Sequence, residues 1–194
     1  MSRIAIVVLS CLAVAPVLQG CAGAILAGGV TAANIAHDRR TAGSFVEDQN
    51  IELKASSELA SDKELEQQTH VKVISYNQVV LLTGQAPSQE LRSRAESLVR
   101  TVPKVRRVHN EIQIASPSAL SARSSDTWIT SKVKVRLFRI EMKNFDPTRV
   151  KVTTSNGTVY LMGLVTRAEA DAVVDVVRKI EGVQRVVKIF EYIG

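Results

Sequence analysis

Residues 150–163, VKVTTSNGTVYLMG, predict a β-hairpin. Apolar and polar residues alternate at the start of this stretch, which is typical of a strand with one buried face. The pair Asn156-Gly157 favours a type I′ turn, the tight turn that joins two antiparallel strands. Residues 71–84, VKVISYNQVVLLTG, align with this stretch at a constant offset of 79, so the chain contains the hairpin twice.

The repetition extends beyond the hairpins. Residues 105–108, VRRV, match residues 183–186, VQRV, at an offset of 78. A helical stripe of apolar residues precedes each segment and is ended by Pro103 in the first copy and by Gly182 in the second. Each copy therefore has the order helix, strand, strand, helix, strand. We predict an α+β fold of two tandem domains, each with its helices packed on one face of a three-stranded sheet.

The segments outside the copies indicate the domain boundaries. We expect the first domain at residues 45–115 and the second at residues 126–194. Residues 116–125 consist mainly of Ser, Ala and Pro with one Arg, which is typical of a linker. Residues 21–44 are rich in Ala and Gly and have no clean period, so we expect a flexible tether there.

Residues 1–20 have the pattern of an export signal. Arg3 precedes an almost unbroken apolar run at residues 4–17. This run is shorter than the roughly 20 apolar residues needed to cross a bilayer core, so a cleaved signal fits better than a membrane helix. Residues 18–21, LQGC, resemble a bacterial lipobox. The resemblance implies that Cys21 begins the mature chain and carries the lipid, and the alternative is an ordinary secretory signal with a buried Cys21.

The two copies together resemble a known family. Their order of elements, the hairpins that end at Gly84 and Gly163, and the closing Val-x-x-Val strand are similar to the BON domain of bacterial envelope proteins. Two such domains behind a lipobox, with DTWIT at residues 126–130, resemble the dual-BON outer-membrane lipoproteins. The resemblance implies a non-enzymatic protein, lipid-anchored at the periplasmic face of the outer membrane. It also implies support of outer-membrane integrity, association with the division site, and contact of the second domain with anionic phospholipid of the phosphatidylglycerol or cardiolipin type.

The two copies differ in net charge. Residues 44–115 hold nine basic and ten acidic residues, a net charge of −1. Residues 116–194 hold thirteen basic and eight acidic residues, a net charge of +5. The positive charge therefore lies in the second copy, which we expect to meet an anionic partner.

The opening helix of the second copy, expected at residues 126–140, carries much of this charge. Ile129, Val133 and Leu137 share one side of it and should face the sheet, while Asp126 or Ser125 could cap its N-terminus. An indole and basic side chains on the other side are what a helix needs to lie at a lipid headgroup layer. The candidate lipid-binding residues are Trp128, Lys132, Val135, Arg136, Phe138 and Arg139. At an offset of 78 the first copy has Asn50 in place of Trp128.

Other functions compete less well. The same face could dock on the first copy or on an acidic envelope protein, which would make the chain a periplasmic adaptor. Nucleic acid would suit the charge, but an exported chain would not meet it. His37, His70 and His109 have no metal ligands at suitable spacing, and the chain lacks a nucleophile elbow and a Gly-rich phosphate loop. We therefore expect no catalytic residues, no metal and no cofactor.

Overall fold

The computed structural model describes residues 39–117 and 120–194, and residues 37–194 form one compact unit. The expected signal, Cys21 and most of the expected tether lie outside the described residues. The first repeat consists of α4 (Ala42–Ser61), α5 (Lys63–Gln68), β1 (His70–Tyr76), β2 (Val79–Ala86), α6 (Gln89–Arg100) and β3 (Arg107–Ile114). The second consists of α7 (Leu120–Leu137), a short 3-10 helix (Pro147–Arg149), β4 (Val150–Ser155), β5 (Thr158–Val165), α8 (Arg167–Val177) and β6 (Arg185–Tyr192).

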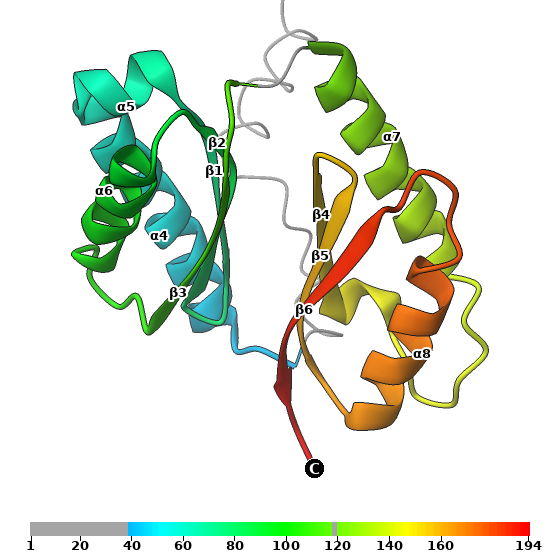
Figure 1. Cartoon of the computed structure of the whole chain (residues 1–194). Helices are drawn as coiled ribbons and strands as arrows, with labels where there is room; N and C mark the ends of the chain where they lie inside the picture. The colour runs from blue at the N-terminus through cyan, green and yellow to red at the C-terminus, as the bar shows by residue number, and fades with distance from the viewer. Residues whose placement is uncertain (1–38, 118–119) are drawn as a thin grey trace, which may run out of the picture. The chain divides into compact units, whose positions relative to one another are not determined.

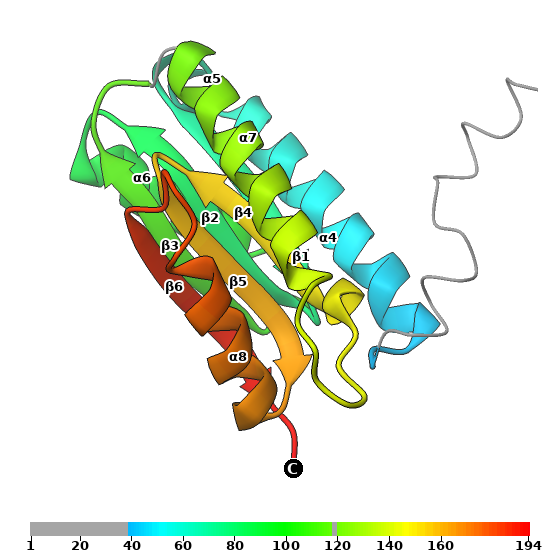
Figure 2. The ribbon, with the colours of Figure 1, turned by 90° about the vertical axis from the view of Figure 1, so that its right-hand side faces the viewer.

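Each repeat contains one three-stranded sheet. The strand orders are β1-β2-β3 and β4-β5-β6, with an antiparallel hairpin followed by a parallel third strand. Figure 1 shows α4 and α6 beside the first sheet, and in Figure 2 α7 and α8 lie in front of the second sheet. The predicted α+β fold with two tandem domains is confirmed.

The hairpin turns follow the local sequence. Asn156 and Gly157 have φ values of 49° and 73°, and Asn77 and Gln78 have values of 50° and 64°. A type I′ turn requires positive φ at both central residues, which Asn and Gly tolerate best. The prediction of this turn at Asn156-Gly157 is confirmed.

Asp126 has a different role from the one expected. The helix α7 begins at Leu120, so Asp126 and Ser125 lie inside it and the N-cap expectation is wrong. The Asp126 carboxylate instead accepts hydrogen bonds from the backbone N–H groups of Asn156 (2.8 Å) and Gly157 (2.9 Å). Asp48 binds the turn of the first hairpin in the same way. Each opening helix therefore holds the hairpin of its own repeat through one carboxylate.

The helices cover one apolar face of each sheet, and the opposite faces are also apolar. Buried residues of β1 and β2 form one cluster with buried residues of β5 and β6; its members are Ile74, Tyr76, Val79, Leu81, Tyr160, Met162 and Ile189. The Tyr76 hydroxyl donates to the carbonyl of Arg149 (3.1 Å), and Lys151 pairs with Glu52 (2.6 Å). The two repeats therefore contact each other through the outer faces of their sheets, and α4 adds an ion pair to β4.

Candidate functional site: the outer face of α7

Core packing determines which side of α7 faces outward. Ile129, Val133 and Leu137 are buried against the second sheet, as the sequence predicts. Thr130 lies beside them and its hydroxyl donates to the hydroxyl of Thr154 on β4 (2.7 Å). Gly182 approaches this side closely, since a Cβ there would lie 3.2 Å from Ile129. These contacts leave the opposite side of α7 facing solvent.

The outward side carries large apolar side chains. Trp128 is 65% exposed, Val135 55% and Phe138 69%. At about 100° per residue, Trp128 and Val135 lie within one narrow sector, and Phe138 lies beside it in the turn that follows the helix. Lone exposed apolar residues are ordinary, but three of this size on one short segment form a patch that calls for a partner.

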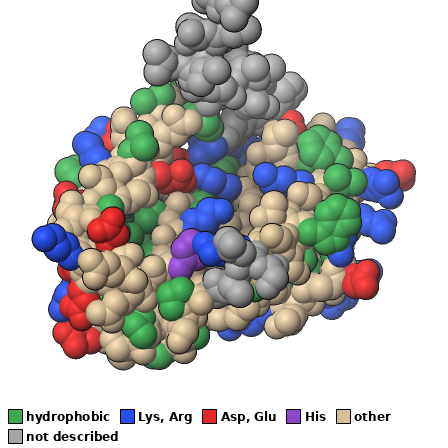
Figure 3. Space-filling view, turned by 90° about the horizontal axis from the view of Figure 1, so that it is seen from above, with side chains coloured by type: hydrophobic (Ala, Val, Ile, Leu, Met, Phe, Trp, Pro, Cys, Tyr) green, Lys and Arg blue, Asp and Glu red, His purple; other side chains and the backbone are tan. Residues whose placement is uncertain are grey.

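Basic side chains surround this patch. Arg136 and Arg139 are exposed and form no ion pair with any described residue. The Lys132 ammonium donates to the carbonyl of Glu181 (2.8 Å) and lies 5.8 Å from the centre of the Trp128 ring. The structure thus brings together all six candidates, Trp128, Lys132, Val135, Arg136, Phe138 and Arg139, as one surface, here called the α7 outer face. Figure 3 shows green apolar and blue basic side chains together where α7 lies, at the right of the view.

A groove beside this surface contains a residue that sequence reasoning missed. Lys132 and Arg136 line one side of the groove from α7. Lys179 and Ile180, which come just after the end of α8, line the other side. Its volume is about 470 Å³. Lys179 adds a third cation to this groove. It lies 47 positions from Lys132 in the chain, so no local pattern connects the two, and only the packing of α8 against α7 brings them together.

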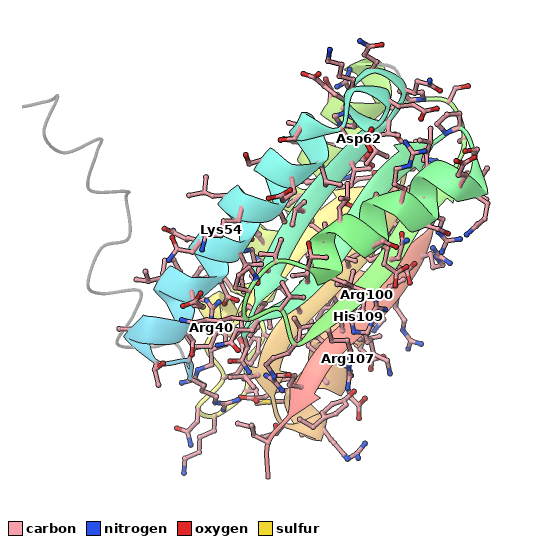
Figure 4. All side chains as sticks on the ribbon, turned by 90° about the vertical axis from the view of Figure 1, so that its left-hand side faces the viewer. Arg40, Lys54, Asp62, Arg100, Arg107 and His109 are labelled. Carbon is pink, nitrogen blue, oxygen red and sulfur yellow. The ribbon has the colours of Figure 1, made fainter. Side chains whose placement is uncertain are left out.

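The corresponding helix of the first repeat has the opposite character. The helix α4 has four acidic residues and one base, Lys54, whereas α7 has four bases and one acid. Figure 4 shows Lys54 on α4, Arg40 near its start and Asp62 at its end. Leu53 is 70% exposed on α4, but acidic side chains occupy the neighbouring turns. A basic and apolar outer face is therefore a property of the second repeat.

The groups with shifted pKa values lie elsewhere. Burial would raise the pKa of Glu169, but hydrogen bonds from Arg39 (2.6 and 2.9 Å) and Thr166 outweigh it and lower this pKa overall. Burial, followed by the charge of Arg107, lowers the pKa of His109. Within residues 39–117 and 120–194, no three His, Cys, Asp or Glu residues gather in a way that could hold a metal ion. In the same part of the chain, no helix is both long and apolar enough to span a bilayer.

The comparisons with known proteins agree with this architecture. The family model described as BON domain matches residues 47–116 and 125–194. The chain is 36% identical to "Outer membrane lipoprotein DolP" of Haemophilus influenzae over 91% of its own length and 90% of that protein. It is 35% identical to the "21 kDa hemolysin" of Actinobacillus pleuropneumoniae (80% and 79% covered) and 28% identical to "Osmotically-inducible protein Y" of Escherichia coli (74% and 72% covered). The chain belongs to the BON domain family and contains two BON domains, one in each repeat.

Proposed function

We propose that this chain is an outer-membrane lipoprotein, anchored through Cys21, whose second BON domain binds anionic phospholipid through the α7 outer face. The lipobox-like residues 18–21 and the name of the Haemophilus influenzae relative, an outer membrane lipoprotein, support the anchor and its membrane. The observation that carries the lipid contact is the exposure of Trp128, Val135 and Phe138 among arginines that have no partner in the described structure.

The chemistry of this surface fits a headgroup layer. An indole has an apolar body and one N–H donor, so it is stable where hydrocarbon gives way to water. Each basic residue near an anionic surface contributes about 1 kcal/mol. Lys132, Arg136 and Arg139 together would then contribute about 3 kcal/mol, before any apolar contact is counted. Phosphatidylglycerol and cardiolipin supply the anionic phosphates that this surface would bind.

A weak intrinsic affinity is sufficient because of the anchor. Residues 22–38 join Cys21 to Arg39, which is bound to Glu169. At about 3.3 Å per residue this segment spans at most about 55 Å. Such a short connection holds a binding surface at a millimolar effective concentration near its target. The α7 outer face therefore governs how the protein is oriented on the membrane, while Cys21 governs whether it is there.

The biological role follows from that orientation. A protein held flat on anionic lipid would accumulate where such lipid is enriched, and we infer from the BON resemblance that this occurs at the division site in support of outer-membrane integrity. We propose a binding protein and not an enzyme, because the α7 outer face offers apolar and cationic contacts but no nucleophile or general base.

The substitution Trp128→Glu tests the lipid contact. The mature chain, with Cys21→Ser so that it stays unacylated, is mixed with phosphatidylcholine vesicles with or without phosphatidylglycerol, and flotation measures binding. We expect the parent chain to float with the anionic vesicles only, and Trp128→Glu to weaken that binding about tenfold, since it removes the aromatic anchor and adds a repelled charge. Added salt should weaken binding further.

Leu53→Glu is the matched control, because it also puts a charge in place of a large exposed apolar side chain, but on α4. This variant should bind as the parent chain does. Circular dichroism establishes that both variants are folded. If folded Trp128→Glu floats as well as the parent, the α7 outer face serves something other than lipid, and the alternative is that it docks on an acidic envelope protein.

A further inference from the structure

A second basic surface lies on another side of α7. It is a pocket of about 410 Å³ between α7, the start of the β1–β2 hairpin and β4. Lys72 lines it from β1, Thr154 from β4, and Arg123, Thr130 and Lys134 from α7. Figure 3 looks on to this region, where blue basic side chains and a purple histidine gather near its centre.

The pocket and the α7 outer face are separate sites on one helix. Arg123, Thr127, Thr130 and Lys134 follow one another at intervals of four, three and four residues, so they share one side of the helix. At about 100° per residue, this side is centred about a third of a circle away from Trp128. The helix α7 therefore has three sides: one in the core, one apolar and basic, and one hydroxyl-rich and basic.

The cations of the pocket have no acceptor in the described structure. The Nε atom of Arg123 is buried and has no hydrogen-bond partner. No described carboxylate pairs with Lys72 or Lys134. Asp126 is the one acidic residue in the lining, and its carboxylate is already bound to the hairpin turn. A buried donor without an acceptor is costly, so the pocket is built to receive an anion.

His70 lies in the positive electrostatic field of the pocket cations. It lies at the start of β1 and lines the pocket with Lys72, Arg123, Lys134 and Asp126. Burial, followed by the charges of Arg123 and Lys72, lowers its pKa. A bound anion would oppose those two charges and raise the pKa of His70, which gives a measurable sign of binding.

The remaining lining indicates the class of ligand. Hydroxyl groups dominate it, among them those of Thr127, Thr130 and Thr154, and Val152 is the one aliphatic side chain among the described lining residues. Such a lining suits a polyol and not an acyl chain. We propose that the pocket binds a hydrophilic phosphate ester, with its phosphate on Lys72, Arg123 and Lys134 and its polyol part on the hydroxyl groups. A free ester such as glycerol 3-phosphate and the exposed glycerophosphate part of a lipid headgroup share this chemistry.

Nuclear magnetic resonance titration of the unacylated mature chain tests this proposal. The probes are inorganic phosphate, glycerol 3-phosphate and, separately, phosphatidylglycerol vesicles. We expect glycerol 3-phosphate to bind saturably and more tightly than phosphate, to shift the backbone amides of Thr127, Thr130 and Thr154, and to raise the pKa of His70. Arg123→Gln should weaken this binding about tenfold, because it removes a charge-assisted hydrogen bond. Lys134→Gln is a second variant at an exposed position, where folding is not at risk.

Arg139→Gln is the control, since it removes an arginine of the α7 outer face and leaves the pocket intact. It should bind glycerol 3-phosphate as the parent does, and so should Trp128→Glu. Shifts without saturation, or an equal loss in Arg139→Gln, would overturn the proposal. If vesicles shift the same pocket amides, the ester is presented by a lipid headgroup; if they shift only the α7 outer face, the ligand is a free ester. If Trp128→Glu no longer binds vesicles but still binds glycerol 3-phosphate, the pocket is a binding site distinct from the lipid contact proposed above.

Discussion

Gly84→Ala is expected to unfold the first repeat. A Cβ at this position would lie 1.8 Å from the carbonyl oxygen of His70, and the backbone of Gly84 has φ = +117°, which L-residues rarely adopt. The clash is with main chain inside the β1–β2 pairing, next to its last pair and opposite Val71, so it cannot be relieved by rotating a side chain. We expect a loss of more than about 4 kcal/mol, a large part of the 5–15 kcal/mol that holds a typical domain together. Thermal or denaturant unfolding measures it.

Two other glycines provide the comparison. Gly163 occupies the same place in the second hairpin, but a Cβ there would lie 2.7 Å from the carbonyl oxygen of Arg149, so Gly163→Ala should cost less than Gly84→Ala. Gly43 lies in the first turn of α4 with no atom closer than 3.8 Å to an added Cβ. Gly43→Ala should leave stability unchanged or raise it by up to about 1 kcal/mol. A Gly84→Ala chain as stable as Gly43→Ala would contradict the close approach of Gly84 to the His70 carbonyl.

Asp48→Ala is expected to cost about 3–5 kcal/mol, because this carboxylate is buried and serves several donors. It accepts hydrogen bonds from the Ser75 hydroxyl and from the N–H groups of Asn77 and Gln78, each at 2.7 Å. Arg40 also pairs with it at 2.7 Å. Removal of the carboxylate leaves these donors buried beside an apolar methyl group. Chemical denaturation compared with the parent chain measures the loss.

Asp126→Ala is the matched variant in the second repeat. Its carboxylate serves two backbone N–H groups near solvent, so water can replace it, and we expect a loss of about 1–2 kcal/mol. The order of the two losses is the test. An Asp126→Ala loss equal to or greater than that of Asp48→Ala would show that burial of the first carboxylate is not what makes it important.

The parts of the fold that depend on neighbouring residues could be predicted from the sequence. The hairpins follow from alternation and from turn residues within about ten positions, and the repeat doubles each of these signals. The start of α7 was misplaced because Ser125 and Asp126 are typical N-cap residues, and the Ser- and Ala-rich residues before them were assigned to the linker. The contact between the sheets could have been predicted from β5. Its residues 159–162 are all apolar and do not alternate with polar residues, which is typical of a strand that is buried on both faces, and all four are buried.

The α7 outer face and the pocket also differ in whether they could be predicted from local sequence. The α7 outer face could be predicted because all six of its residues lie within twelve positions, on the helix and the turn that follows it, where the angular spacing decides their side. The pocket could not be predicted, because it joins Lys72 of one repeat to Arg123 and Lys134 of the other. Arg123 was assigned to a linker, and only the tertiary structure shows its buried, unpaired Nε atom.

The fluorescence of Trp128 tests the lipid contact most directly, because Trp128 is the single tryptophan of the chain. The unacylated mature chain is titrated with vesicles while its emission is recorded. If the α7 outer face meets the headgroup layer, emission shifts to shorter wavelength with phosphatidylglycerol vesicles, stays unchanged with phosphatidylcholine vesicles, and returns when salt is added. Emission that stays unchanged while the chain floats with anionic vesicles would place the lipid contact on another surface.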